Sequence, residues 1–222
     1  ELRGVLIPTQ QDPLWHLAQC DGVWRSEWGP TPSRAPRLIV VVSANRTGKS
    51  TIQGRVTGAH VRGKLPRFTR KGEVWGGMPT LADSAAIMRP HVERWIGTAS
   101  GLKWTPKEAS APTESLLRTA EGWALRLKAY EQGREHWQGG KLQAVYLDEQ
   151  PPDDVLSEAR ARLIDLEGVL LSTFTALAGT DSSLYSEAYE PWQAYRARHP
   201  ESRWGEVAPG VWVFSVGMRD NA

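Results

Sequence analysis

The sequence has a single cysteine, Cys20, and this scarcity of thiols limits the classes of protein to which it can belong. One cysteine cannot form a disulfide within the chain, and it cannot supply a thiolate cluster for zinc. No run of apolar residues approaches the roughly 18 that a membrane-spanning helix needs, so a soluble protein is expected. The 222 residues are enough for one domain with a substantial core.

The chain also has little excess charge. Its 27 Lys and Arg residues against 25 Asp and Glu give a formal net charge of +2. The overall charge therefore does not predict a nucleic-acid-binding protein, and any basic surface has to be local. The most basic stretch contains Arg62, Lys64, Arg67, Arg70 and Lys71. Such a run is either a solvated face or a surface for contacts with a phosphate backbone, and the sequence leaves both open.

Strands and helices alternate along most of the sequence. Residues 1–36 form an irregular lead-in with a short helix expected at 13–20. Segments around 116 and at 123–130 are predicted to pair as a hairpin. Apolar runs predict further strands at 38–42, 72–78, 142–147, 168–174 and 210–216, and helices are predicted at 49–61, 83–95 and 151–168. This order predicts an α/β domain with a mainly parallel sheet flanked by helices.

Three features of these helices predict how they end or pack. Gly54 and Gly58 each cost the first helix about 1 kcal/mol relative to alanine, which suggests close packing on the strand behind it. Pro90 is expected to kink or split the second helix. One face of the third helix is predicted to be buried through Val155, Leu156, Ala159, Leu163 and Ile164.

The segment from Ser43 to Ser50 has the pattern of a phosphate-binding loop (P-loop). It matches G-x-x-x-x-G-K-[ST] at every position except the first, where serine replaces glycine. Backbone N–H groups of such a loop surround a β-phosphate, Lys49 neutralises β- and γ-oxygens, and Ser50 ligates Mg²⁺. A Cβ at Gly48 would collide with the phosphate or strain the backbone. The predicted nucleotide-binding residues are Ser43, Ala44, Asn45, Arg46, Thr47, Gly48, Lys49, Ser50 and Thr51.

A second motif, "LQAVYLDE", is an apolar strand that ends in two carboxylates. Parallel sheets bind ligands at the carboxyl ends of their strands, so this pair is expected beside the P-loop. Asp148 would hold Mg²⁺ through water, and Glu149 would act as general base on the attacking water. Small-molecule kinases and GTP switches do not need a base next to the metal aspartate. The pair therefore favours an NTPase that hydrolyses ATP repeatedly to move a load.

Several segments resemble the ATPase domain of the large terminase subunit of tailed bacteriophages. They are "YEQGREHWQGGKLQAVYLDEQPPDDVLSEARARL" (130–163), "GVLLSTFTALAGTDSSLY" (168–185), the lead-in "TQQDPLWH" and the final "FSVGMRDNA". The resemblance spans nearly all of the chain. It implies a P-loop NTPase fold of the additional-strand, catalytic-glutamate type, with ATP and Mg²⁺ bound.

The resemblance also implies roles for individual residues. Arg46, inside the loop, would reach the phosphates. Thr173 and Thr175, in "STFT", belong to the coupling motif that reports loss of the γ-phosphate, and the sequence does not separate them. Arg134 is the candidate for an arginine finger that enters a neighbouring subunit's site, with Arg46 as the alternative. Gln11 is preferred over the adjacent Gln10 as the adenine contact.

The partners and location follow from the same resemblance. It implies a ring of subunits in the host cytoplasm, docked on the portal protein of a procapsid and acting with the small terminase subunit. The substrate to be moved is double-stranded DNA, gripped through non-specific backbone contacts. Residues 1–222 are expected to form a single ATPase domain. The family's C-terminal nuclease domain would lie beyond them, so no nuclease activity is expected.

Two other interpretations remain open on the sequence. One is another P-loop nucleic-acid motor, such as a helicase, although a helicase normally has a second motor domain. The other is a nucleotide-binding module that does not hydrolyse its ligand. Ser43 in place of glycine, and Phe174 and Ala176 in the coupling motif, favour that second alternative.

Overall fold

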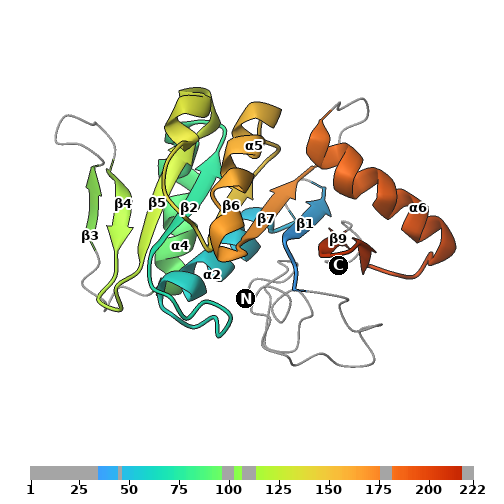
Figure 1. Ribbon diagram of the computed structural model, residues 1–222, viewed down its shortest axis with the longest axis horizontal. Helices are drawn as coiled ribbons and strands as arrows, with labels where there is room; N and C mark the ends of the chain where they lie inside the picture. The colour runs from blue at the N-terminus through green and yellow to red at the C-terminus, as the bar shows by residue number, and fades with distance from the viewer. Residues whose placement is uncertain (1–34, 45–46, 97–102, 107–113, 176–181, 217–222) are drawn as a thin grey trace.

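The computed structural model describes residues 35–44, 47–96, 103–106, 114–175 and 182–216. Nine strands of this described part form one sheet in the order β3-β4-β5-β2-β6-β7-β1-β9-β8 (Figure 1). The central strands run parallel: β5 (Ala124–Ala129), β2 (Glu73–Met78), β6 (Ala144–Asp148), β7 (Val169–Phe174), β1 (Leu38–Ser43) and β9 (Val211–Val216). Antiparallel strands close the two edges: β3 (Lys103–Pro106), β4 (Glu114–Arg118) and β8 (Trp204–Ala208). The predicted α/β class with a mainly parallel sheet is confirmed.

Helices cover both faces of the sheet. The segments are α2 (Lys49–Val61), α3 (Leu81–Asp83), the π-helix η2 (Ser84–Met88), α4 (Arg89–Ile96), the 3₁₀ turns η4 (Tyr130–Gln132) and η5 (Arg134–Trp137), α5 (Asp153–Ala161), the 3₁₀ turn η6 (Ile164–Leu166), the π-helix η7 (Tyr185–Tyr189) and α6 (Glu190–Arg198). Among the described residues, no helix combines the length and hydropathy that crossing a bilayer requires.

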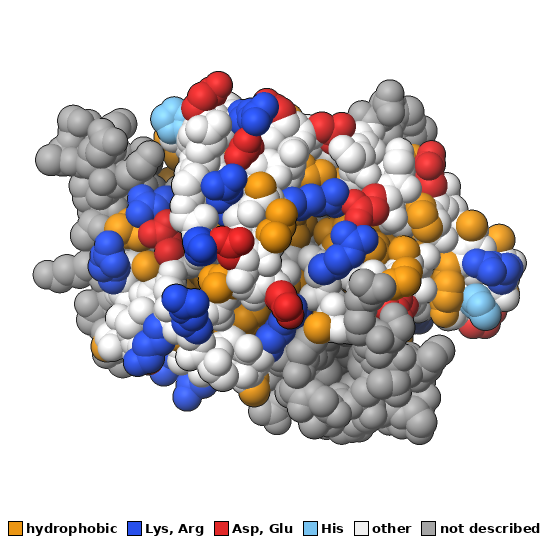
Figure 2. All heavy atoms as spheres, viewed as in Figure 1, with side chains coloured by type: hydrophobic (Ala, Val, Ile, Leu, Met, Phe, Trp, Pro, Cys, Tyr) orange, Lys and Arg blue, Asp and Glu red, His pale blue; other side chains and the backbone are white. Residues whose placement is uncertain are grey.

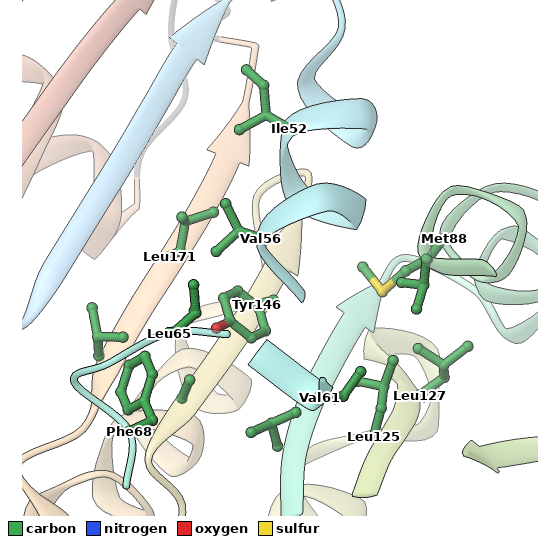
Figure 3. Close-up of a cluster of buried hydrophobic side chains, with 14 of the residues drawn as sticks. Ile52, Val56, Val61, Leu65, Phe68, Met88, Leu125, Leu127, Tyr146 and Leu171 are labelled. Carbon is green, nitrogen blue, oxygen red and sulfur yellow. The ribbon is translucent and has the colours of Figure 1, made fainter. Parts of the chain in front are cut away.

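The core has two parts, one on each face, because successive strand residues point in opposite directions. In β1, Ile39 and Val41 join the cluster under α2 and α4, whereas Val40 and Val42 join the cluster under α5 and α6. Every residue of β1 is buried, as expected for a strand with helices on both sides. Figure 3 shows the first cluster, in which side chains of α2 meet those of β5, β6 and β7.

Proline is accommodated inside two helices by a π turn. Pro90 was expected to kink or split its helix, but α3, η2 and α4 follow one another without a gap from Leu81 to Ile96. Proline lacks an N–H and its ring crowds the carbonyl four residues earlier, and a wider turn removes both conflicts. The same arrangement recurs where η7 precedes Pro191 in α6. The helix is therefore not split, and the irregularity at Pro90 takes the form of a local change of helix type.

The two glycines of α2 face another helix and not the strand behind them. A Cβ on Gly54 would lie 2.6 Å from Cβ of His91, and one on Gly58 would lie 3.0 Å from Cβ of Trp95. Both partners are on α4, which packs along α2. Close packing was predicted correctly, but its partner was wrong. The helical spacing of the two glycines alone does not identify which neighbouring element their face of α2 contacts.

Some helical predictions fail at the ends of the segments. Ile164 was expected on the buried face, yet it is 74% exposed, whereas Leu163 is buried. The α-helix ends at Ala161 and the chain continues in the tighter turn η6, which rotates the next side chains away from that face. The strands β3 and β8 and the helix η7–α6 were not predicted. The expected helix at 13–20 lies outside the described residues.

A buried histidine in the first core cluster predicts a loss of stability in acid. His60 of α2 is fully buried, its Nδ1 lies 2.7 Å from the Tyr146 hydroxyl, and its ring stacks on Phe68. Burial, and to a lesser extent the charge of Arg67, lower its pKa from 6.5 to about 3. The unfolded chain therefore binds a proton below pH 6.5 that the folded chain does not accept.

Lowering the pH from about 7.5 to about 5 should then reduce the free energy of unfolding by about 2 kcal/mol through this group alone. Urea unfolding of the His60→Phe variant should lack this component of the pH dependence. His136→Phe, at an exposed position, should keep it. If the free energy of unfolding depends on pH equally in the wild type and in the His60→Phe variant, the prediction is wrong.

Candidate nucleotide-binding and hydrolysis site

The predicted site residues converge at the carboxyl edge of the parallel strands. The P-loop follows β1, the Asp148-Glu149 pair ends β6, and Thr175 follows β7. Strand β7 lies between β1 and β6 and pairs with both in parallel register. This extra strand separates the loop strand from the carboxylate strand. The hydroxyls of Thr173 and Thr175 are thereby placed between the loop and the two carboxylates.

The P-loop enters α2 through a left-handed glycine. Gly48 is the N-cap residue with φ 94° and ψ 18°, a conformation that glycine adopts without steric cost. Ser43, which replaces the first glycine of the template, is the last residue of β1 and does not have a positive φ. Its hydroxyl lies 2.5 Å from that of Thr47, which donates to the carbonyl of Ala44 at 2.7 Å. The serine therefore fits this turn, and its side chain links the two ends of the loop.

Lys49 is folded back over the loop. Its Nζ donates to the carbonyl of Ala44 at 3.0 Å and to Oγ1 of Thr175 at 2.9 Å, and the carbonyl of Ser43 is 3.4 Å away. Only 7% of this residue is exposed. The cation is thus held by neutral acceptors, which leave its charge available to an anion.

Asp148 is buried and has a hydroxyl donor on each oxygen. Ser50 Oγ donates to Oδ2 at 2.6 Å, and Thr173 Oγ1 donates to Oδ1 at 2.6 Å. The side chain of Gln53, one turn further along α2, lies 3.1 Å from the Thr173 hydroxyl. The acid is 2% exposed, so these contacts replace the water that a carboxylate would otherwise bind. They join α2, β6 and β7 at one point.

Glu149 has the properties of a base next to this cluster. Partial burial and the nearby charge of Asp148 raise the pKa of its carboxyl, against the opposing effects of Lys49 and a hydrogen bond from the Thr175 backbone. Its backbone has φ 61°, in the left-handed region that few residues other than glycine adopt. A carboxylate with a raised pKa is a better proton acceptor, and unusual backbone geometry often occurs at functional sites.

The donor set beside Asp148 suits magnesium but is not a complete cage. Mg²⁺ prefers oxygen ligands and usually takes only one or two from the protein, with the rest from phosphates and water. The adjacent oxygens of Ser50 and Asp148 fit this pattern. In the described part of the chain, no group of three or more His, Cys, Asp or Glu side chains could hold a metal ion.

Other predicted residues lie apart from this cluster or outside the description. Arg134 lies on η5, where Nε and Nη2 contact Oε1 of Glu158 at 2.9 Å and 2.8 Å, and its side chain is 57% exposed. Thr51 is buried in the first turn of α2. Asn45, Arg46, Gln10 and Gln11 lie outside the described residues, as does Ala176.

The basic stretch between α2 and β2 lies at the opposite edge of the sheet. Arg62 donates to the carbonyl of Ile96 at 2.8 Å and Arg67 to that of Pro36 at 2.8 Å, so both hold the loop in place. In Figure 2, Lys and Arg side chains gather at the lower left, on the side where Figure 1 places this segment. The exposed members of the stretch are Lys64, Arg70 and Lys71.

Two residues at the site were not predicted. Gln53 is a polar residue on a face of α2 that also carries Ile52 and Val56, and a polar residue among buried apolar ones was a usable signal. Tyr130 ends the segment 123–130, and its hydroxyl lies 2.8 Å from the carbonyl of Asp148. Only its position at the carboxyl end of a predicted strand indicated that it would approach the site.

The fold defines a structural class. A P-loop motif after β1, a carboxylate pair at the end of β6 and an additional strand between β1 and β6 give the chain a P-loop NTPase fold with an additional strand. No model of a known protein family matches the sequence, and no curated protein matches it either.

Large terminases of bacteriophages are among the solved structures to which the fold is similar. The chain is similar to the large terminase of bacteriophage HK97, with a TM-score of 0.59 and 17% identity over 97% of this chain and 42% of that one. It is also similar to the large terminase of a thermophilic bacteriophage in complex with ADP, with a TM-score of 0.55 and 15% identity over 93% and 45% of the two chains. At this identity the likeness shows a shared fold. The chain spans less than half the length of these proteins.

Proposed function

We propose that this chain is the ATP-hydrolysing motor domain of a phage terminase large subunit, which drives double-stranded DNA into a procapsid. The observation that carries the proposal is the convergence of Lys49, Ser50, Asp148 and Glu149 around the P-loop. The Thr175 hydroxyl contacts Lys49, and the Thr173 hydroxyl contacts Asp148. A scaffold that only binds nucleotide has no need of a base beside the metal aspartate. The fold likeness to large terminases, one of them solved with ADP, supports the same assignment.

The residues suggest a sequence of roles in hydrolysis. The loop amides and Lys49 would hold the β- and γ-phosphates, with Lys49 exchanging the Ala44 carbonyl and Thr175 hydroxyl for phosphate oxygens. Ser50 and Asp148 would hold Mg²⁺, which neutralises developing charge on the phosphates when bound. Glu149 would orient the attacking water and accept its proton. Thr175, which contacts Lys49, and Thr173, which contacts Asp148, would both register loss of the γ-phosphate.

The rest of the nucleotide has space beside the loop. A cavity of about 590 Å³ opens next to Ser43 and Ala44 and is bounded by Thr175, Ser215 and helix α6. Its wall includes Tyr189, Gln193 and Arg196 from the helical segment. Gln11, or the adjacent Gln10, would supply a further contact to adenine, as the resemblance of the lead-in to that of large terminases implies. Residues 1–222 would act as one ATPase domain.

DNA would be gripped at a separate surface. The exposed residues Lys64, Arg70 and Lys71 lie at the edge of the sheet opposite the P-loop. A packaging motor has to move any sequence, so contacts with the phosphate backbone are the expected mode. The motor would assemble as a ring on the portal protein, with the small terminase subunit delivering DNA.

Lys49→Ala should weaken ATP binding about 10- to 100-fold and abolish detectable hydrolysis, because charge-assisted hydrogen bonds to phosphate are each worth about 1.5–3 kcal/mol. Calorimetric titration with ATP and Mg²⁺ and a phosphate-release assay measure the two effects. Lys141→Ala is the matched control and should bind and hydrolyse normally. Lys141 is an exposed lysine that precedes β6 and pairs with Asp165 of η6. Normal turnover in the Lys49→Ala variant would exclude the proposed site.

A further inference from the structure

Tyr130 lies beneath the turn that carries the two carboxylates. It is buried at the start of η4, and its hydroxyl lies 2.8 Å from the carbonyl of Asp148, 3.1 Å from that of Gly77 and 3.3 Å from that of Glu149. Strand pairing of β6 with β7 extends to Asp148, and pairing with β2 ends at Leu147. The hydroxyl therefore supplies a hydrogen-bond donor to backbone carbonyls at the point where the pairing of β6 with β2 ends.

The turn above this hydroxyl needs a restraint. Glu149 is one of two residues other than glycine that have a positive φ in the described part of the chain. A residue persists in such a conformation only where its surroundings hold it there. With a φ of 61°, Glu149 makes the chain turn sharply at the end of β6. Its carboxylate stays beside Asp148, Lys49 and Thr175. A donor to the carbonyls on both sides of its α-carbon limits how far this turn can relax.

The ring of Tyr130 is closely packed against Gly77 and Trp137. A Cβ on Gly77 would lie 2.9 Å from Cε1 of Tyr130 and 2.5 Å from the Trp137 ring, so only glycine lets the two rings cross β2. The two ring centroids are 5.9 Å apart. Trp137 is held in turn by a hydrogen bond from its Nε1 to the carbonyl of Ala129 at 3.3 Å. The position of the hydroxyl is thus fixed by the packing of its ring against Trp137, a residue of η5.

We infer that Tyr130 is a positioning residue for hydrolysis: its hydroxyl holds the Asp148–Glu149 turn so that the Glu149 carboxylate faces the attacking water. The inference rests on the proposed function for its catalytic consequence, whereas the restraint on the turn does not depend on it. Tyr130 touches no substrate and acts only through Glu149.

Tyr130→Phe, which removes only the hydroxyl, should lower kcat for ATP about 10- to 100-fold with KM changed less than about twofold, because a small misplacement of a catalytic group has an effect of this size. In a Glu149→Gln background the same substitution should have no further effect on residual single-turnover hydrolysis. A residue that acts through Glu149 has nothing left to position once that carboxylate is gone. A further loss in the double variant would show that Tyr130 acts elsewhere and would overturn the inference.

The control is Tyr146→Phe, which also removes a fully buried hydroxyl, here the one bonded to His60 in the other core cluster. It should lower stability and leave kcat unchanged. Hydrogen–deuterium exchange without nucleotide separates the inference from the proposed function. Tyr130→Phe should speed exchange in peptides spanning 148–152 at least about tenfold, and Tyr146→Phe should not. If the wild type hydrolyses no ATP, the proposed function fails while this measurement still tests the restraint. Unchanged exchange at 148–152 overturns the inference.

Discussion

Arg134→Ala is expected to lower ATP hydrolysis by the assembled motor about 10³- to 10⁵-fold, the range over which an arginine finger stabilises charge on the transferring phosphoryl group. The isolated domain should keep its ATP affinity, since Arg134 is outside the cluster around Lys49. In the single chain the guanidinium is exposed and contacts Glu158. Entry into a neighbour's site would require Arg134 to leave Glu158 for phosphate, and the largely buried Glu158 carboxylate would keep its contact with Arg162.

Mixed assemblies provide the decisive measurement for Arg134. Each of the variants Arg134→Ala and Glu149→Gln lacks a group that the other can supply at a shared interface, so mixing them should restore part of the activity. Arg162→Ala is the matched control. Arg162 lies at the C-terminal end of α5, and its Nη2 is 3.4 Å from Oε2 of Glu158, whereas Arg134 contacts Oε1. This control variant should leave hydrolysis unchanged. Absence of rescue in correctly assembled rings would transfer the finger role to Arg46 in its own site.

Glu149→Gln is expected to lower hydrolysis about 10²- to 10⁴-fold, the usual contribution of a positioned general base. An amide has nearly the same shape but cannot accept the proton of the attacking water. ATP and Mg²⁺ should stay bound, because neither Lys49 nor the Ser50–Asp148 pair depends on this carboxylate. Equilibrium binding of ATP and single-turnover hydrolysis in the same preparation separate the two effects.

Glu167→Gln is the control for this substitution. Glu167 is the other glutamate with a positive φ among the described residues, at 48°, and it is exposed after η6. Its replacement tests whether glutamine in a left-handed turn is harmful by itself, and activity should be retained. If Glu149→Gln abolishes nucleotide binding, Glu149 is a metal ligand or a structural residue and the base has to be sought elsewhere.

Local patterns in the sequence predicted the parts of the site that lie within one strand–loop–helix segment. The run from Leu38 through Lys49 determined β1, the loop and the start of α2, because loop chemistry and helical spacing are encoded by neighbouring residues. The "LQAVYLDE" motif likewise predicted β6 and the place of its two acids. The match of "STFT" to a coupling motif singled out Thr173 and Thr175, and each of them contacts a different member of the cluster.

What depends on packing between distant segments was not predictable in this way. The edge strands β3 and β8 have only four and five residues, so no period marks them, although each pairs with the next strand along the chain. Leu184, Ala188 and Trp192 are buried at intervals of four residues along the segment of η7 and α6, yet no helix was predicted there. Gly54 and Gly58 indicated a close approach without indicating that α4 is the helix that approaches.

The sequence by itself determined that this chain has a P-loop, a carboxylate pair and an α/β order of elements, since these depend on residues close together in the chain. The tertiary structure decided that β7 lies between β1 and β6, that Thr173 and Ser50 divide the two oxygens of Asp148, and that Tyr130 lies under Glu149. Each of these contacts joins residues separated along the chain. They form only because burying both faces of one sheet brings the strand ends to a common edge, and no local pattern records which side chains meet there.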